Sequence, residues 1–389
     1  MVKFLHTADW QLGQTLKSIG PEKAEELRKA RLESIRNLLR LASEEDVDFV
    51  LSAGDNFESN QVSNDLVRQT ARILNGYSTI PIYIIPGNHD PLMEDHPFSR
   101  LASDRFGDHI HILTKEEPIK VPRVDATIYP GICRQKRSSN NPIDWIPGRH
   151  ARDGVRVGLA HGSWQVMKDL PKDDYPIDEN SSKENQLDYL ALGHWHSTFS
   201  SPGEEPKRTF YSGTPEPTSF GERDSGNVLI VEIDGPKNPP QILKKNVSEY
   251  DWIEKKVTVS DEASIDSIRD DFLSTDLDTG KTLLNLVVSG TISLEVNELY
   301  EDLLKELKEK FYYVGDDKTA LSFVPSDEEI QELSTGKGWL KWAVERLKNL
   351  VSEDEGYVPD DWPFDQPPTE EEAERALGLI YAKVKEKGE

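Results

Sequence analysis

The 389-residue sequence predicts an α/β fold with an appended α+β unit and helices at its C-terminal end. In the first 235 residues, short apolar runs of strand length alternate with longer amphipathic patterns, which is typical of strands covered by helices. A proline- and glycine-rich stretch at 235–240 marks a boundary, and a tighter alternation of strand and helix patterns follows it. Five of the first apolar runs also lead to a carboxylate, an amide or an imidazole.

The predicted strands of the first domain, residues 1–235, are each followed by a polar side chain. Asp9 follows the run 4–5, Asp55 follows 49–51, Asn88 follows 82–85, His161 follows 155–160 and His194 follows 189–192. Ligands of open α/β sheets gather outside the carboxyl ends of the strands, so we expect these side chains at one edge. Amphipathic helices are predicted at 21–42 and 64–74, and the second has apolar residues for a core or a partner.

A compact α+β domain is predicted for residues 241–325. Its strands are expected at 252–259, 282–289 and 320–323, and its helices at 263–273 and 295–311. Residues 334–389 are predicted to form a helical tail with two apolar stripes, at 340–351 and 373–384. Thr369 and Glu372 have the spacing of a capping box at the start of the second tail helix. The tail either packs on its own domain or docks on a partner.

The polar residues at the strand ends are of the types that bind transition metals. Carboxylate, amide oxygen and imidazole nitrogen suit manganese, iron or zinc. Two metal ions about 3.5 to 4 Å apart need a carboxylate that bridges them. Asp55 is the natural bridge, because the small Gly54 lets the backbone turn sharply before it. With His196 two residues after His194, the pattern predicts a two-metal site for phosphoester chemistry.

The order and spacing of these motifs resemble the calcineurin-like metallophosphoesterase superfamily. Within it, the chain resembles the nuclease subunit of the double-strand-break repair complex, called SbcD in bacteria. Two stretches carry this resemblance: LHTADWQLG at residues 5–13 and FYSGTP at residues 210–215. It covers residues 1–235 and implies a two-sheet sandwich flanked by helices, with a capping domain beside the active site to hold DNA.

The resemblance also implies a role for each motif residue. Two divalent metal ions, preferably manganese, would be held by seven side chains: one ion by Asp9, Gln11, Asp55 and His196, the other by Asp55, Asn88, His161 and His194. His89 would stay unligated beside the scissile phosphate, where an imidazole can donate a proton or a hydrogen bond to the developing oxyanion. Asp90 either orients that ring and raises its pKa or is a turn residue before Pro91.

Gln11 departs from the family, which has a histidine at this position. A glutamine offers a neutral carbonyl oxygen, a weaker donor than imidazole, so we expect the first metal to bind less tightly. Three explanations stay open: a natural variant with a shifted metal preference, a chain with impaired nuclease activity, or an introduced substitution. The other charged ligands favour a working enzyme. His6, inside the first strand, is expected to pack or to hydrogen-bond locally.

The net charge of −25 is unusual for a DNA-binding protein, because Lys and Arg provide most of the non-specific affinity for phosphates. The acidic excess is concentrated in the appended part: residues 1–240 carry 28 basic against 36 acidic residues, and residues 241–389 carry 18 against 35. Arg134, Lys136 and Arg137 form a basic loop that is a candidate contact to the DNA backbone. A solvated loop without a partner is the alternative.

Similar nucleases work with an SMC-like ATPase of the SbcC type and form homodimers, so we expect both partners alongside DNA. No P-loop occurs in the sequence, which places any ATP on another subunit. The single Cys133 cannot form an internal disulfide, no apolar run reaches membrane-spanning length, and the start has no signal-peptide pattern. We expect a cytoplasmic protein without a membrane partner, in which Cys133 is buried or half-buried.

Three classes of function fit this sequence. The first is a metal-dependent DNA nuclease that processes DNA ends with an ATPase, as an exonuclease and with endonuclease activity also open. The second is a phosphatase or phosphodiesterase acting on a small substrate, although such enzymes usually lack a cap and tail of this size. The third is a weakly active or inactive scaffold subunit, which Gln11 keeps open.

Overall fold

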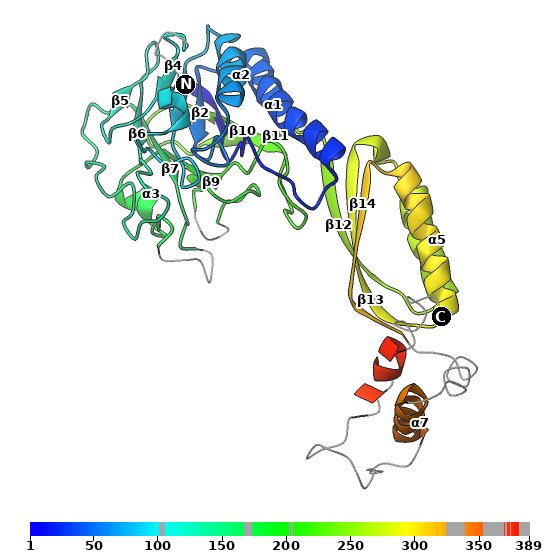
Figure 1. The fold of residues 1–389 in the computed structure, drawn as a ribbon. Coiled ribbons are helices and arrows are strands. Elements are labelled where there is room, and N and C mark those ends of the chain that lie inside the picture. The colour runs from blue at the N-terminus through cyan, green and yellow to red at the C-terminus, as the bar shows by residue number, and fades with distance from the viewer. Residues whose placement is uncertain are drawn as a thin grey trace. The chain divides into compact units, whose positions relative to one another are not determined.

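The structure is a computed structural model that describes residues 1–100, 106–166, 173–201, 203, 205–323, 339–352, 369, 372–373 and 375–380. The chain divides into two compact units, Met1–Asp251 and Trp252–Glu389. Figure 1 labels the helices and strands of both units. Within the described ranges, none of the helices combines the length and hydropathy that crossing a bilayer requires.

Two β-sheets form the body of the first unit. The first sheet has the strand order β11-β10-β1-β2-β3-β4, with β1 to β4 parallel and β10 antiparallel to β1. Its strands are β1 (Val2–Thr7), β2 (Phe49–Ala53), β3 (Ile82–Ile85), β4 (Ile110–Ile112), β10 (Asn227–Ile233) and β11 (Gln241–Asn246). The second sheet has the order β5-β6-β7-β8-β9, with β6 to β9 parallel. Its strands are β5 (Ile119–Lys120), β6 (Ala126–Pro130), β7 (Val155–His161), β8 (Tyr189–Gly193) and β9 (Thr209–Tyr211).

The two sheets face each other across a shared apolar core. Phe4 of β1 stacks on Phe49 of β2 with ring centroids 4.9 Å apart, and Tyr189 of β8 meets Phe4 edge-on at 5.3 Å. His6 joins the sheets as well, because its Nδ1 lies 2.9 Å from the Tyr189 hydroxyl and its Nε2 lies 3.2 Å from the Leu192 carbonyl oxygen. The predicted two-sheet sandwich is confirmed, and so is the hydrogen bonding expected of His6.

Two long helices cover the other face of the first sheet. α1 (Pro21–Glu44) starts with a proline, whose fixed φ suits the first helical position, and α2 (Asn64–Asn75) is capped by the side chain of Ser63. Ile35 of α1 and Val67 of α2 pack in one buried cluster with strand residues such as Val50. Both predicted helices are confirmed, to within two residues at each end. Two shorter elements are η1 (Pro97–Arg100) and α3 (Ser181–Glu184).

β11 lies beyond the point, residue 235, at which the sequence suggested that the first domain ends. It pairs antiparallel with β10 from Gln241 to Asn246, so the proline- and glycine-rich stretch between the two strands is a hairpin turn. The first unit therefore continues to Asp251. A surface turn and an interdomain linker have the same composition, which is why the pattern at 235–240 suggested a boundary.

The second unit is built on a three-stranded sheet, β12-β13-β14, in which β13 and β14 are parallel. Its elements are β12 (Asp251–Thr258), α4 (Glu262–Leu273), η3 (Thr279–Lys281), β13 (Thr282–Ile292), α5 (Leu294–Lys310) and β14 (Tyr313–Phe323). Phe272 of α4 and Leu303 of α5 pack with Leu286 of β13. The expected order of strands and helices is confirmed. β14 is longer than predicted, because its half-buried or exposed middle, 315–318, lacks an apolar pattern.

Two described helical pieces follow in the second unit, α7 (Trp339–Ser352) and residues 375–380. Gly378 packs against the end of β14, since a Cβ there would lie 1.7 Å from the Phe323 carbonyl oxygen. The predicted capping box is confirmed: Thr369 N donates to Oε2 of Glu372 at 2.8 Å, and Glu372 N donates to Oγ1 of Thr369 at 3.2 Å. The remainder of the predicted tail lies outside the described residues.

Candidate metal centre

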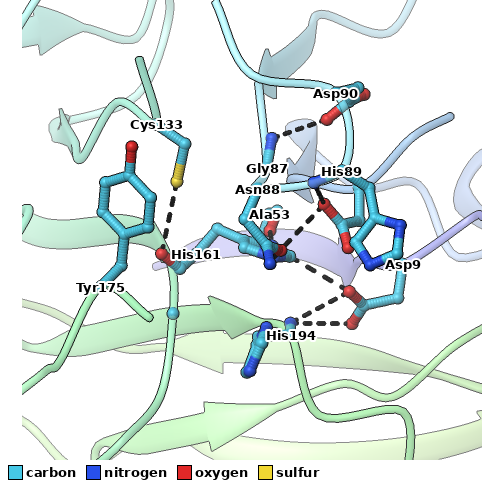
Figure 2. A network of polar contacts seen from close by, with 12 residues as sticks. Asp9, Ala53, Gly87, Asn88, His89, Asp90, Cys133, His161, Tyr175 and His194 are labelled. Carbon is cyan, nitrogen blue, oxygen red and sulfur yellow. Dashed lines mark hydrogen bonds and ion pairs between the residues drawn. The ribbon is translucent and has the colours of Figure 1, made fainter. Parts of the chain in front are cut away.

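The carboxyl ends of the parallel strands bring the predicted polar residues together. Asp9 follows β1, Asp55 follows β2 and Asn88 follows β3, while His161 ends β7 and His194 follows β8. Ligand atoms of Asp9, Asp55 and His161 all lie within 4.8 Å of one another, and the three side chains are buried. Figure 2 shows this network, with Asn88, His89 and His194 around it. Both sheets therefore contribute to one centre.

Four residues at this edge have a left-handed backbone. The φ angle is 52° at Asp9, 48° at Gln11, 51° at Asp55 and 117° at His194. Residues other than glycine seldom adopt such angles, and those that do are often at functional sites. The Asp9 amide donates to the Gly54 carbonyl and the Gln11 amide to the Asp55 carbonyl, both at 3.0 Å. The turns after β1 and β2 therefore hold each other in place.

Two motif glycines are required by close approach. A Cβ on Gly87 would lie 2.1 Å from Oδ1 of Asp55. A Cβ on Gly54, whose φ is 89°, would lie 2.6 Å from Nδ1 of His161. A side chain at either position would displace a candidate ligand, so these positions in the motifs need glycine.

Asp55 is in the middle of the network. Its Oδ1 accepts a hydrogen bond from the His89 amide at 2.8 Å and lies 3.4 Å from Nε2 of His161. Its Oδ2 accepts a hydrogen bond from Nε2 of Gln11 at 3.0 Å. Burial alone would raise the pKa of Asp55, but the imidazoles of His161 and His89 outweigh it and lower the pKa. A carboxylate that stays ionised among several partners suits the predicted bridge.

His161 presents one ring nitrogen to the centre. Its Nδ1 lies 2.8 Å from the Ala53 carbonyl oxygen, which can only accept, so we place the ring proton on Nδ1. The Nε2 of the neutral ring then faces Oδ1 of Asn88 at 2.8 Å and Oδ1 of Asp55 at 3.4 Å. Three electron-pair donors that point at one another fit a divalent cation between them.

Two carboxylates that the sequence did not single out hold the histidines of the last motif. Nδ1 of His196 lies 2.9 Å from Oε1 of Glu222, and Nε2 of His194 lies 3.0 Å from Oδ2 of Asp174. Burial would lower the pKa of both rings, but the carboxylates raise it above its ordinary value. Histidines that bind metals usually donate their second N–H to a carboxylate or carbonyl. This habit implies such partners, but no local motif indicates which loop supplies them.

Gln11 is buried and has one unsatisfied atom. While its Nε2 donates to Asp55, its Oε1 has no hydrogen-bond partner among the described residues. A buried carbonyl oxygen without a partner costs about 1 to 3 kcal/mol, and a cation or its water would remove that penalty. Asp9 is also buried and accepts two hydrogen bonds from the His194 amide, each at 3.0 Å. The donor set as a whole therefore fits divalent cations.

The comparison with protein families agrees with this geometry. Residues 2–198, just over half of the chain, match the family model for calcineurin-like phosphoesterases. The chain belongs to the calcineurin-like phosphoesterase family. Domains of this family bind divalent metals, and the cluster of Asp9, Asp55 and His161 is where the described part of this chain could hold one.

Two curated relatives of this phosphoesterase domain are bacterial. The uncharacterised metallophosphoesterase YhaO of Bacillus subtilis is 27% identical over 243 residues, which cover 59% of this chain and 57% of that protein. The D chain of the nuclease SbcCD of Staphylococcus saprophyticus is 26% identical over 269 residues, which cover 61% of this chain and 67% of that protein. The chain thus spans little more than half the length of YhaO. A crystal structure of TT1561 of Thermus thermophilus matches with a TM-score of 0.41 and 11% identity, covering 63% of this chain and 99% of that one.

His89 lies at the edge of the phosphoesterase centre with an exposed ring. Its side chain is 44% exposed, and its Nδ1 lies 3.2 Å from the Glu58 carbonyl oxygen, which leaves Nε2 toward solvent. Asp90 does not orient this ring. Its buried carboxylate accepts hydrogen bonds from the amides of Gly87, Asn56 and Phe57, which makes it a clamp between two motif loops. Burial raises the pKa of Asp90 to about 8.

The basic loop of Arg134, Lys136 and Arg137 is exposed. The Tyr175 hydroxyl accepts the amides of Arg134 and Gln135, each at 3.0 Å, and Arg137 forms an exposed ion pair with Asp173 at 3.1 Å. The loop is therefore fixed to the segment that carries Asp174, beside the candidate metal centre. Cys133, directly before the loop, is buried as expected.

Proposed function

We propose that this chain is a two-metal DNA nuclease. The observation that carries the proposal is the convergence of carboxylate, amide and imidazole donors on Asp55, with the exposed ring of His89 at their edge. We assign one cation, preferably manganese, to Asp9, Gln11, Asp55 and His196, and the other to Asp55, Asn88, His161 and His194. This assignment leaves His89 free for the substrate.

The residues divide the work of hydrolysis among them. When bound, the two cations supply an activated water nucleophile and offset the charge that develops on the phosphate. Asp55 holds their separation with its two oxygens, and Ala53 keeps Nε2 of His161 free of its proton. His89, protonated, donates from Nε2 to the phosphate or the leaving oxygen, because Nδ1 stays on the Glu58 carbonyl.

DNA is the proposed substrate for two reasons. One relative is named as a chain of the nuclease SbcCD, and the exposed basic loop at 134–137 is fixed to the wall of the metal centre. We assign Arg134, Lys136 and Arg137 to the sugar-phosphate backbone, where such contacts position a strand without reading its sequence.

The experiment that tests this proposal uses two substrates with manganese, a linear duplex DNA and a chromogenic phosphodiester. We expect cleavage of the duplex from its ends, and loss of cleavage after the metals are chelated. Cleavage of the small ester with intact DNA would favour the small-substrate phosphodiesterase. With two bound metals and no hydrolysis of either substrate, the scaffold function would be the better account.

Gln11 is the observation that favours the scaffold, and its replacement tests that role. Gln11→His supplies an imidazole in place of a neutral amide, so we expect the manganese concentration for half-maximal activity to fall by roughly tenfold, about 1.4 kcal/mol of binding. Activity is titrated against manganese for both forms, and metal occupancies are refined in crystals of each. Gln14→His, whose amide reaches the Thr218 carbonyl at 3.2 Å, is the control and should leave the midpoint unchanged. An unchanged midpoint in Gln11→His, with both positions full in the wild type, would mean that glutamine is a tolerated ligand.

We further propose that the tail docks on an SMC-like ATPase of the SbcC type and that the chain forms a homodimer. The helices of the tail bury Val344 and Leu377 but leave Trp342 and Leu379 58% and 59% exposed. Removing residues 334–389 should leave a folded, metal-binding first unit that no longer co-purifies with the ATPase.

Substitutions within the tail sharpen this test. The double variant Trp342→Ser, Leu379→Ser removes only exposed apolar surface, so we expect it to lose the ATPase while it keeps the fold. Asn349→Ser, at another exposed position of α7, is the matched control. Equal recovery of the ATPase by all these forms would refute the docking role. Sedimentation equilibrium of the full chain tests the homodimer.

A further inference from the structure

Asp174 contacts two of the candidate ligands of the second metal. Its Oδ1 accepts a hydrogen bond from Nδ2 of Asn88 at 3.2 Å, and its Oδ2 lies 3.0 Å from Nε2 of His194. The side chain is 18% exposed, and its pKa lies below the usual value because His194 outweighs the effect of burial. Each carboxylate oxygen thus has a different ligand residue as its partner.

The backbone around Asp174 is fixed on both sides. The Asp174 carbonyl accepts the amide of Ser163 at 3.1 Å, two residues beyond His161. On the other side, the Ser138 carbonyl accepts the amide of Tyr175 at 2.9 Å. Gly162 makes the approach possible, because a Cβ there would lie 2.1 Å from the Tyr175 carbonyl oxygen. The carboxylate of Asp174 is therefore held by neighbouring strand-end loops.

The contact with Asn88 decides which way its amide points. A carboxylate only accepts hydrogen bonds, so Asn88 must present Nδ2 to Asp174. Its Oδ1 then points to the other side, where it lies 2.8 Å from Nε2 of His161. The reverse orientation would set two acceptor oxygens against each other and remove the amide oxygen from the centre.

The contact with His194 selects a ring nitrogen in the same way. With Nε2 donating to Asp174, the other nitrogen, Nδ1, is the one left for a cation. His196 has the opposite arrangement, since Glu222 and Thr218 hold its Nδ1 at 2.9 and 2.8 Å and leave Nε2. The two histidines of one motif are thus oriented by two different carboxylates.

We propose that Asp174 is the positioning residue of the second metal position, where it sets the amide orientation of Asn88 and the ring orientation of His194 at once. This inference rests on the proposed two-metal function. It also implies a division of labour, in which Asp174 acts on the second metal position and Glu222 on the first.

The test measures manganese binding to the full chain by calorimetry and electron paramagnetic resonance. Asp174→Asn keeps the shape but has one acceptor oxygen in place of two, so either Asn88 or His194 loses its partner. We expect the second ion to bind 10- to 100-fold more weakly, the usual effect of losing such a support. The spectrum of a coupled manganese pair should give way to that of an isolated ion. Asp174→Glu, which keeps both oxygens, should restore part of the affinity.

Two further variants serve as controls. Asp173→Asn makes the same charge change one residue away, at an exposed carboxylate paired with Arg137, and should bind both ions as the wild type does. Glu222→Gln should weaken the first ion and leave the second unchanged. A circular dichroism spectrum and a melting curve for each variant exclude loss of the fold.

Each outcome decides between the inference and the function on which it rests. Two ions bound to Asp174→Asn with wild-type affinity would overturn the positioning role, and so would a manganese-bound crystal with an Asp174 oxygen directly on the metal. A wild type that binds fewer than two ions would overturn the two-metal function and the inference with it. A wild type that binds two ions but leaves DNA intact would remove only the nuclease.

Discussion

Asp55→Asn should reduce phosphodiester hydrolysis by about 100-fold or more, which corresponds to about 2.7 kcal/mol of lost transition-state stabilisation. The substitution replaces a charged carboxylate by a neutral amide with one acceptor oxygen, whereas both oxygens of Asp55 are in use in the structure. Since this residue is the proposed bridge, both cations should bind more weakly. Rates at saturating manganese and metal counts on the purified variant measure the two effects.

The control for Asp55 is the same chemical change at a surface position. Asp302→Asn alters a carboxylate of α5 that is 64% exposed and pairs with Lys305, so the rate should stay close to that of the wild type. If Asp55→Asn kept more than about a tenth of the wild-type rate, a loss of less than about 1.4 kcal/mol, the bridge would have been assigned to the wrong residue.

His89→Ala should lower the turnover number by roughly 100- to 10,000-fold while metal and DNA binding stay intact, because general acid catalysis typically contributes that much. The His89 amide, which bonds Asp55, survives the substitution, so the bridging carboxylate keeps its support. Anomalous scattering at the manganese edge reports the metals, a DNA titration reports binding, and single-turnover rates report the chemistry.

His150→Ala is the matched control for His89, since it removes another exposed imidazole of the first unit. Its turnover should not change. Loss of metal from crystals of His89→Ala would show that this histidine is a ligand. Weaker DNA binding with an unchanged turnover number would make it a substrate-binding residue.

The strand-end ligands could be predicted from the sequence because their position depends on local pattern alone. An apolar run predicts a strand, and the carboxyl ends of parallel strands meet at one edge, so Asp9, Asp55 and Asn88 had to be neighbours. α1 and α2 were predictable for a similar reason, since a continuous amphipathic period extends over each of them.

The residues that support those ligands were not predictable, because loops of irregular conformation bring them in. Asp174 is one of two successive aspartates, and Glu222 comes 26 residues after the histidine that it contacts. Asp90 is a further example: beside His89 and Pro91 it suggested a ring-orienting residue or a turn, and in the fold its carboxylate is buried on amides from two loops. Contacts of this kind depend on tertiary structure, for which a single sequence has no local signal.

The left-handed backbone at Asp9, Gln11, Asp55 and His194 has a consequence for how this centre can evolve. Each such residue costs about 1 to 2 kcal/mol relative to an ordinary backbone, although a short aspartate tolerates it better than glutamine or histidine does. Glycine would relieve that strain, so drift toward greater stability favours the loss of the side chains that the chemistry needs. A lineage released from selection for catalysis should therefore lose these positions first and gain a sturdier, inert protein.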